Sequence, residues 1–227
     1  HTLLAMRTEA AEFITHDLLT PLAAAHTWLQ SLGAERLQPA QPHALGDAQR
    51  LLDQTRMLSD QYLGMLRAEL LPRAQLRALD FGALVDDVCE NATPAQGMRL
   101  TRTIDIGTTI VGDATLLTRA LTALLTDAFS RAPAKTQVEL RLEHDAAQSE
   151  AVLSIAHRGA GLSPSLRTRL YQQSFDGELL GANDLGLALA AKVCRLHRMR
   201  LRFETARDTG SAIRVVKKTA AGATNAP

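Results

Sequence analysis

The chain has 227 residues, with 25 Lys and Arg against 24 Asp and Glu, so its formal net charge is +1. This balance excludes a strongly basic nucleic-acid-binding protein and an acidic solvating chain. Apolar residues make up 46% and charged residues 22%, which is typical of a globular protein of one or two domains. Aromatic residues make up only 4%, which favours helices and a core of aliphatic side chains.

No run of 18 apolar residues and no secretory signal pattern occurs, so we expect no membrane contact within this sequence. The chain starts at His1 instead of Met, which indicates a fragment or a processed product. Cys89 and Cys194 lie in apolar helical patterns, without the spacing of metal ligands or of a disulfide framework. We expect both to be buried free thiols.

The first 72 residues have the periodicity of two helices. Apolar residues recur at steps of three and four over 1–33 and continue through Pro21, which predicts one kinked helix. A turn is predicted at 39–42, and a second helix from about Ala44 to Leu71. Two such helices form an antiparallel hairpin whose apolar stripes need a partner, so we expect a dimeric four-helix bundle.

Residues 73–219 alternate between helical and strand patterns. Helices are expected at about 80–93 and 114–130, with Asp80 and Asp113 as N-caps, and at about 184–197. The expected strands are 99–104, 109–111, 137–143, 151–157, 200–204 and 212–216. This order predicts an α/β sandwich with strands in mixed order and helices on one face, followed by a flexible tail at 220–227.

Three polar residues interrupt the first predicted helix. His16 and Thr20 are four residues apart and share a face, and Asp17 is adjacent to His16. A carboxylate can orient a nucleophilic imidazole, and a hydroxyl one turn away can position water or a phosphoryl oxygen. The alternative is a partly exposed histidine with a local Asp contact on an amphipathic helix, and spacing alone favours that alternative.

The segment from His16 to Leu22, His-Asp-Leu-Leu-Thr-Pro-Leu, resembles the phosphoacceptor box of bacterial two-component sensor histidine kinases. The resemblance covers almost the whole chain and implies a dimeric helical hairpin followed by an α/β sandwich of the histidine-kinase ATPase type. It implies that His16 is phosphorylated, that Asp17 assists the transfer, and that Thr20 helps water attack the phosphorylated aspartate of a response regulator. Leu19 departs from the family, which often has Arg there.

The second unit resembles the ATP-binding domain of that family in outline but not in its ATP contacts. Ala123 and Asp127 stand where the family's N box has two Asn residues, the second of which holds magnesium. His157 stands where the first glycine box has the Asp that accepts a hydrogen bond from the adenine amino group, whereas Gly159 and Gly161 remain.

The second glycine box also departs from the family. Aligned on Gly186, the chain has Ala182 and Asp184 where the family has glycines. We expect Asp184 to cap the following helix, where its carboxylate would occupy the amides that a phosphate needs and would repel phosphate. The lid between the boxes, about 163–183, keeps the aromatic residues Tyr171 and Phe175.

Because the metal, base and phosphate contacts all differ, we expect no cofactor and no metal site, and a histidine phosphotransferase or response-regulator phosphatase that uses His16. Two alternatives stay open. One is a divergent kinase that uses ATP and magnesium, and the other is a non-catalytic regulator that binds a kinase or a receiver domain. The expected partners are a response-regulator receiver domain, a second copy, or another histidine kinase, without nucleic acid. The expected location is the cytoplasm, on its own or as part of a larger sensor.

Overall fold

The computed structural model describes residues 23, 25–27, 29, 41–70, 76–92, 98–105, 107–145, 147–172, 182–206 and 210–218. The chain divides into two compact units, His1–Leu70 and Leu71–Pro227, which are treated separately. Most of the predicted first helix, including its kink at Pro21, and the predicted tail at 220–227 lie outside the described residues.

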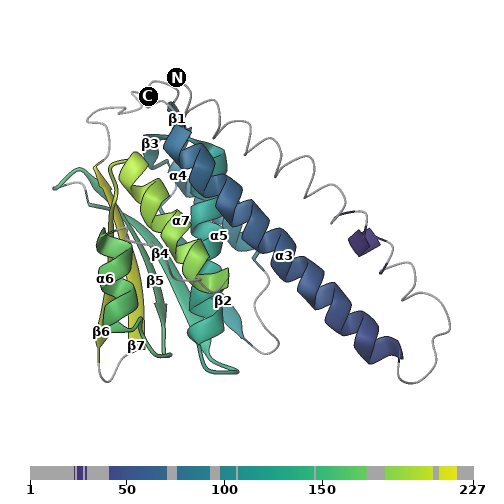
Figure 1. Ribbon diagram of the computed structural model, residues 1–227. Coiled ribbons are helices and arrows are strands. Elements are labelled where there is room, and N and C mark those ends of the chain that lie inside the picture. Colours follow the sequence, from purple (N-terminus) through teal and green to yellow (C-terminus); the bar gives the residue numbers. More distant parts are fainter. Residues whose placement is uncertain are drawn as a thin grey trace. The chain divides into compact units, whose positions relative to one another are not determined.

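Unit 1 contains the helix α3, Gln41–Leu70 (Figure 1). The second predicted helix is therefore confirmed, but the turn predicted at 39–42 is wrong in its second half, because Gln41 and Pro42 are helical. Proline fits the first turn of a helix, where its missing N–H would have no partner. Within the same unit, Nε2 of His26 lies 3.2 Å from Oδ1 of Asp53, so the segment before α3 lies beside it.

Unit 2 alternates helices and strands from β1 to β7 (Figure 1). Two of its elements, β1 and α6, were not predicted. The elements are β1 (Arg77–Asp80), α4 (Phe81–Glu90), β2 (Arg99–Ile104), β3 (Thr109–Gly112), α5 (Ala114–Arg131), β4 (Gln137–Asp145), β5 (Glu150–His157), α6 (Pro164–Gln172), α7 (Ala182–Leu196), β6 (Arg200–Ala206) and β7 (Gly210–Lys218).

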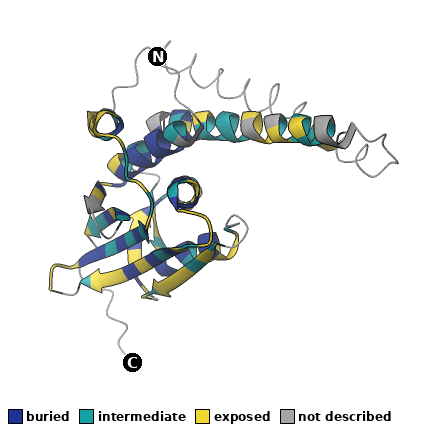
Figure 2. Ribbon diagram, turned by 90° about the horizontal axis from the view of Figure 1, so that it is seen from below, coloured by how far each residue is buried: buried dark blue, intermediate teal, exposed yellow. Residues whose placement is uncertain are grey.

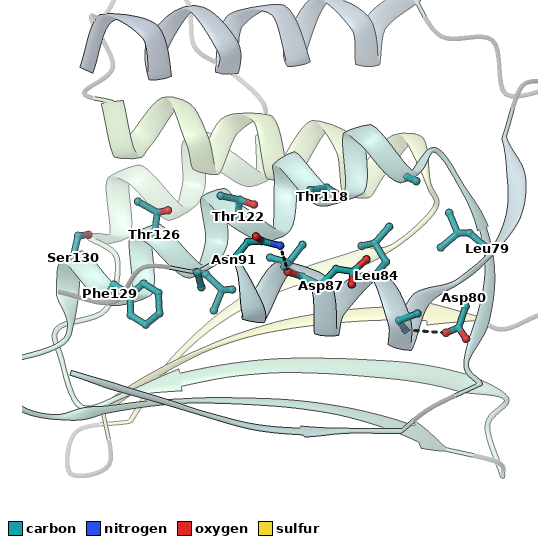
Figure 3. Close-up of a pocket in the computed structure, with 15 residues that line it drawn as sticks. Leu79, Asp80, Leu84, Asp87, Asn91, Thr118, Thr122, Thr126, Phe129 and Ser130 are labelled. Carbon is teal, nitrogen blue, oxygen red and sulfur yellow. Dashed lines mark hydrogen bonds between the residues drawn. The ribbon is translucent and has the colours of Figure 1, made fainter. Parts of the chain in front are cut away.

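Five of these strands form one sheet in the order β2-β4-β5-β7-β6, and β1 pairs with β3 in a separate two-stranded sheet. Only β2 and β4 are parallel within the larger sheet, and its other pairs are antiparallel. The helices α4, α5 and α7 lie over one face of the larger sheet (Figures 1 and 3). This arrangement confirms the predicted α/β sandwich with strands in mixed order.

The core lies between this sheet and its helices. Along β5, buried residues alternate with less buried ones (Figure 2), as expected for a strand with one face against the core. Cys89 and Cys194 are buried free thiols, as predicted. Burial raises the pKa of Cys89 to about 11 and that of Cys194 to about 12, so neither is a reactive thiolate at neutral pH.

Two of the three predicted helix caps are confirmed. Oδ1 of Asp80 accepts a hydrogen bond from the Ala83 amide at 3.0 Å, and Oδ1 of Asp113 accepts one from the Leu116 amide at 2.8 Å. The third prediction is wrong: α7 begins at Ala182, so Asp184 lies in its first turn and is not the N-cap. A carboxylate at that position is still favoured by the positive end of the helix dipole. Among the described residues, no helix has the length and hydropathy needed to cross a bilayer.

Candidate functional site

The helix α5 places two of the predicted site residues side by side. Ala123 and Asp127 are one turn apart on a buried face, where they are 8% and 2% exposed. The strand β5 ends at His157, which is 4% exposed and pairs in register with Ser211 of β7. The candidate site is therefore formed by the C-terminal half of α5, the end of β5 and the start of α7.

Asp127 is paired within the protein. Nε of Arg131, one helical turn further along α5, donates a hydrogen bond to Oδ1 of Asp127 at 2.8 Å. Burial raises the pKa of the Asp127 carboxyl, Arg131 opposes this rise, and the charge of Asp184 adds to it. Asp184 in the first turn of α7 is thus close enough to repel Asp127, and the two negative charges share one small region.

His157 uses its acceptor nitrogen locally. Nδ1 of His157 accepts a hydrogen bond from the Gly159 amide at 3.0 Å. Burial lowers the pKa of His157, and the positive charge of Arg131 lowers it further. The ring is therefore neutral at pH 7, and its proton lies on Nε2 because Nδ1 is the acceptor.

Two glycines allow close backbone contacts around this histidine. A Cβ at Gly159 would lie 1.8 Å from the carbonyl oxygen of Arg131, so the turn after β5 packs directly on the end of α5. Gly210 has a φ of +97°, and a Cβ there would lie 2.1 Å from the carbonyl oxygen of His157. Oγ of Ser211 also donates to the Gly159 carbonyl at 3.3 Å. The turn is therefore fixed from both α5 and β7.

The structure brings together four of the predicted residues and one that was not predicted. Asp127, His157 and Gly159 lie around Arg131, and Asp184 lies close enough to Asp127 to raise its pKa; we call these five residues the Arg131 cluster. The spacing of Arg131 four residues after Asp127 on one helix was the signal that could have identified it.

The other predicted residues lie apart from these contacts. Gly161 follows in the extended segment before α6, and Gly186 is buried inside α7. His16, Asp17 and Thr20 lie outside the described residues. In the described part of the chain, no group of three or more His, Cys, Asp or Glu residues is placed to hold a metal ion.

A second buried histidine fixes the start of α5. Nε2 of His197 accepts a hydrogen bond from the Asp113 amide at 2.9 Å, and Nδ1 lies 2.8 Å from the Val193 carbonyl oxygen. Burial lowers the pKa of His197, as expected for a neutral ring that donates from Nδ1 and accepts at Nε2. Through Asp113, which caps α5, His197 links the end of α7 to the helix that carries Asp127.

Residues 112–221 match the family model described as "Histidine kinase-, DNA gyrase B-, and HSP90-like ATPase". The chain is similar to the sensor-like histidine kinase SenX3 of Mycolicibacterium smegmatis, with 23% identity over 219 residues, 91% of this chain and 56% of the relative. SenX3 of Mycobacterium tuberculosis is 26% identical over 221 residues, 91% of this chain and 52% of the relative. The chain thus spans about half the length of the curated relatives it matches.

Two solved structures have the same fold. Full-length ShkA, whose structure is described as a complex with AMPPNP, superposes with a TM-score of 0.68 at 20% identity, over 94% of this chain and 47% of ShkA. The mycobacterial sensor histidine kinase MprB superposes with a TM-score of 0.54 at 24% identity, over 63% of this chain and 97% of MprB. Unit 2 therefore has the α/β sandwich fold of the histidine-kinase ATPase type, and the chain is similar to two-component sensor histidine kinases.

Proposed function

We propose that this chain acts in two-component signalling as a histidine phosphotransferase and response-regulator phosphatase, and that it does not phosphorylate itself from ATP. In this proposal His16 is the phosphoacceptor and a receiver domain is the phosphoryl donor. The observation that carries the proposal is the Arg131 cluster, in which Asp127 is bonded to Arg131 and His157 to the Gly159 amide, so both groups are already used within the protein. This cluster supports a domain that positions partners and does not hold a nucleotide.

Asp127, at the position of the family's magnesium ligand, is poorly suited to bind a metal ion. A magnesium ion on a triphosphate needs carboxylate or amide oxygens that face the phosphates and water. Asp127, which stands at that position, is buried and already accepts from Arg131 at 2.8 Å. Recruiting its carboxylate to a metal would require breaking this pair inside the protein, where an unpaired charge is unfavourable.

His157 and Asp184, at the positions of the family's adenine and phosphate contacts, are poorly suited to bind a nucleotide. An adenine amino group needs a hydrogen-bond acceptor, but Nδ1 of His157 is occupied by the Gly159 amide and Nε2 carries a proton. The carboxylate of Asp184, in the first turn of α7, would repel phosphate groups at that helix end. We therefore derive no catalytic step through ATP or magnesium.

Phosphotransfer from a receiver domain to this chain needs neither ATP nor magnesium bound to unit 2. The unprotonated imidazole nitrogen of His16 would attack the phosphorus of an aspartyl phosphate, forming an N–P bond while the P–O bond to the aspartate breaks and its carboxylate leaves. Asp17 would take up the charge or the proton of the other ring nitrogen. For hydrolysis, Thr20 would position a water that attacks the same phosphorus and releases inorganic phosphate.

The divergent ATP-dependent kinase is the second candidate. It is favoured by the match of residues 112–221 to an ATPase family model and by the likeness to relatives named as histidine kinases. A non-catalytic regulator is the third candidate, and it differs from the other two because it would not need His16.

The test measures where a radioactive phosphoryl group goes. The purified chain is incubated with a receiver domain labelled from acetyl phosphate, and separately with labelled ATP and magnesium. We expect label on the wild-type chain from the receiver domain but not from ATP, and no label on His16→Ala. Thr20→Ala should keep the transfer but slow release of inorganic phosphate, whereas Thr27→Ala on the same segment should change neither.

Each of the other outcomes contradicts the proposal. Label from ATP on the wild type but not on His16→Ala would establish the kinase. Equal labelling of the wild type and His16→Ala would remove His16 from the chemistry. Equal slowing of transfer and hydrolysis by Thr20→Ala would remove the role assigned to Thr20.

A further inference from the structure

A long groove separates α4 from α5 on the side of unit 2 that is shown in Figure 3. Its volume is about 930 Å³, and it is lined by residues of β1, α4 and α5 and the segments next to them. Asp80 and Ala114, where the two helices begin, both line it, as do Asn91 and Ser130, where they end. The groove therefore runs along both helices and not across them.

The floor of this groove is apolar and its edges are polar. Val88 of α4 and Leu125 and Phe129 of α5 are buried at its base. Along α5 the edge consists of Thr118, Thr122 and Thr126, which are exposed and follow one another at four-residue steps (Figure 3). A groove with an apolar floor and polar edges has the shape that accepts the apolar face of another helix.

The other edge is acidic. Asp80 and Asp87 line the groove, and none of the described residues that line it is Lys or Arg. The remaining acidic residues of α4, Asp86 and Glu90, both pair with Arg102, at 3.0 Å and 3.2 Å. Asp87 is exposed and has no ion pair within the described part of the chain, so its charge is uncompensated.

We propose that this groove binds an amphipathic helix of a partner protein, with its apolar stripe on Val88, Leu125 and Phe129 and with Arg or Lys on the flank that meets Asp87. The ten residues of α4 span about 15 Å, which is nearly three turns of a bound helix. Thr122 and Thr126 are one residue from Ala123 and Asp127, about 100° around α5, so the groove is separate from the Arg131 cluster. The proposal does not depend on the proposed function.

The probe is a fluorescently labelled helical peptide of about four turns, with Leu at i, i+4 and i+7 and Arg along one flank. A second peptide keeps the Leu residues and has Glu in place of Arg. We expect the 227-residue chain to bind the Arg peptide at least about tenfold more tightly than the Glu peptide, because only the first complements Asp87. Binding is measured by fluorescence anisotropy at two salt concentrations.

Three variants locate the binding. Thr122→Arg puts a long cation into the middle of the groove and should weaken binding of the Arg peptide by about tenfold or more. Thr101→Arg, at an exposed position on β2, is the matched control and should change nothing. Asp87→Asn should weaken binding about three- to fivefold and reduce its salt dependence. Thermal melting confirms that each variant is folded.

The proposal fails if the two peptides bind equally, if neither binds, or if Thr122→Arg binds as well as the wild type. It also fails if sedimentation shows that the wild-type chain self-associates and that Thr122→Arg alone abolishes this, because the groove would then bind a second copy of the chain.

Discussion

On one side of α5, Asp127 is buried and bonded to Arg131, whereas on the adjacent side Thr118, Thr122 and Thr126 are exposed along an open groove. The first side belongs to a cluster whose acceptors and donors are used within the protein. The second side carries an apolar floor and, across the groove, the exposed carboxylate of Asp87, which has no ion pair among the described residues. The helix α5 thus has one face whose polar groups are bonded within the protein and a second face that borders an open groove with an apolar floor.

The two sides of α5 differ in how far their polar groups are already bonded within the protein. On the closed side, Asp127 is paired with Arg131 although the charge of Asp184 repels it. The open side has the volume of a binding surface and an exposed carboxylate, Asp87, at its edge.

Gly159→Ala should have the largest effect on stability. Its Cβ would lie 1.8 Å from a backbone oxygen of Arg131, which cannot move without disturbing the end of α5. We expect a loss of at least about 3 kcal/mol in the free energy of unfolding, measured with urea. The control is Gly46→Ala in α3, where a Cβ meets nothing within 4 Å and should stabilise by about 0.5–1 kcal/mol. A loss below 1 kcal/mol at Gly159 would mean that the turn is not fixed against α5.

Arg131→Ala should destabilise the chain by about 2–3 kcal/mol at pH 7, because it leaves the Asp127 carboxylate buried without a partner. Adding Asp127→Asn to it should recover most of that loss. Arg141→Ala, which breaks an exposed pair with Glu139, should change stability by less than about 0.5 kcal/mol. Similar losses for Arg131→Ala and Arg141→Ala would show that the cluster is open to solvent.

Stability should fall as the pH drops below about 6.5, the value for an unfolded histidine. His157 and His197 have lowered pKa values in the folded chain, so the unfolded state binds protons first. The contribution of the two neutral rings to the free energy of unfolding is complete above about pH 6.5 and is lost as the pH falls through their folded pKa values. It amounts to about 1.4 kcal/mol for each unit by which the folded pKa lies below the unfolded pKa.

Urea unfolding at pH values between about 5.5 and about 8, on both sides of the reference pKa of histidine, measures this slope. His157→Gln and His197→Gln should each flatten it, whereas His144→Gln, at an exposed position, should not. A wild-type stability that does not change over this range would contradict the description of His157 and His197 as buried, neutral rings.

Asp127 affects stability with the opposite sign. Its pKa is raised in the folded chain, so its stabilising contribution is present at low pH and is lost as the pH rises through its folded pKa.

Replacing Thr118, Thr122 or Thr126 with Ala should have the smallest effect. These side chains are exposed at the groove edge, and Ala has the higher helix propensity, so each change should stabilise by up to about 0.7 kcal/mol. Thermal unfolding of the three single variants measures this. If one of them destabilised the chain by more than about 0.5 kcal/mol, the groove would be filled within the molecule and would not be open.

Periodicity and capping chemistry predicted most of the sandwich from the sequence. Asp80 and Asp113 marked the starts of α4 and α5 because side-chain caps depend on local spacing alone. Asp184 was wrongly predicted as a cap, because the start of α7 is set by backbone angles that the residue type does not determine.

The candidate site could be predicted only in part. Asp127 and His157 were found separately as departures from a family pattern, but their bonds to Arg131 and Gly159 depend on how α5 meets the turn after β5. The groove could not be predicted, because α4 and α5 are distant in sequence and the exposed threonines have the pattern of an ordinary solvated face.

Whether the chain binds a nucleotide is tested most directly by a calorimetric titration of magnesium and ATP into the 227-residue chain. The comparison is the triple variant Asp127→Asn, His157→Asp and Asp184→Gly, which restores one family residue at each of the metal, base and phosphate positions, with circular dichroism to verify its fold. We predict no binding heat for the wild type at nucleotide concentrations up to about 1 mM, and measurable binding by the restored variant. Binding of ATP by the wild type as tightly as by the restored variant would contradict the account.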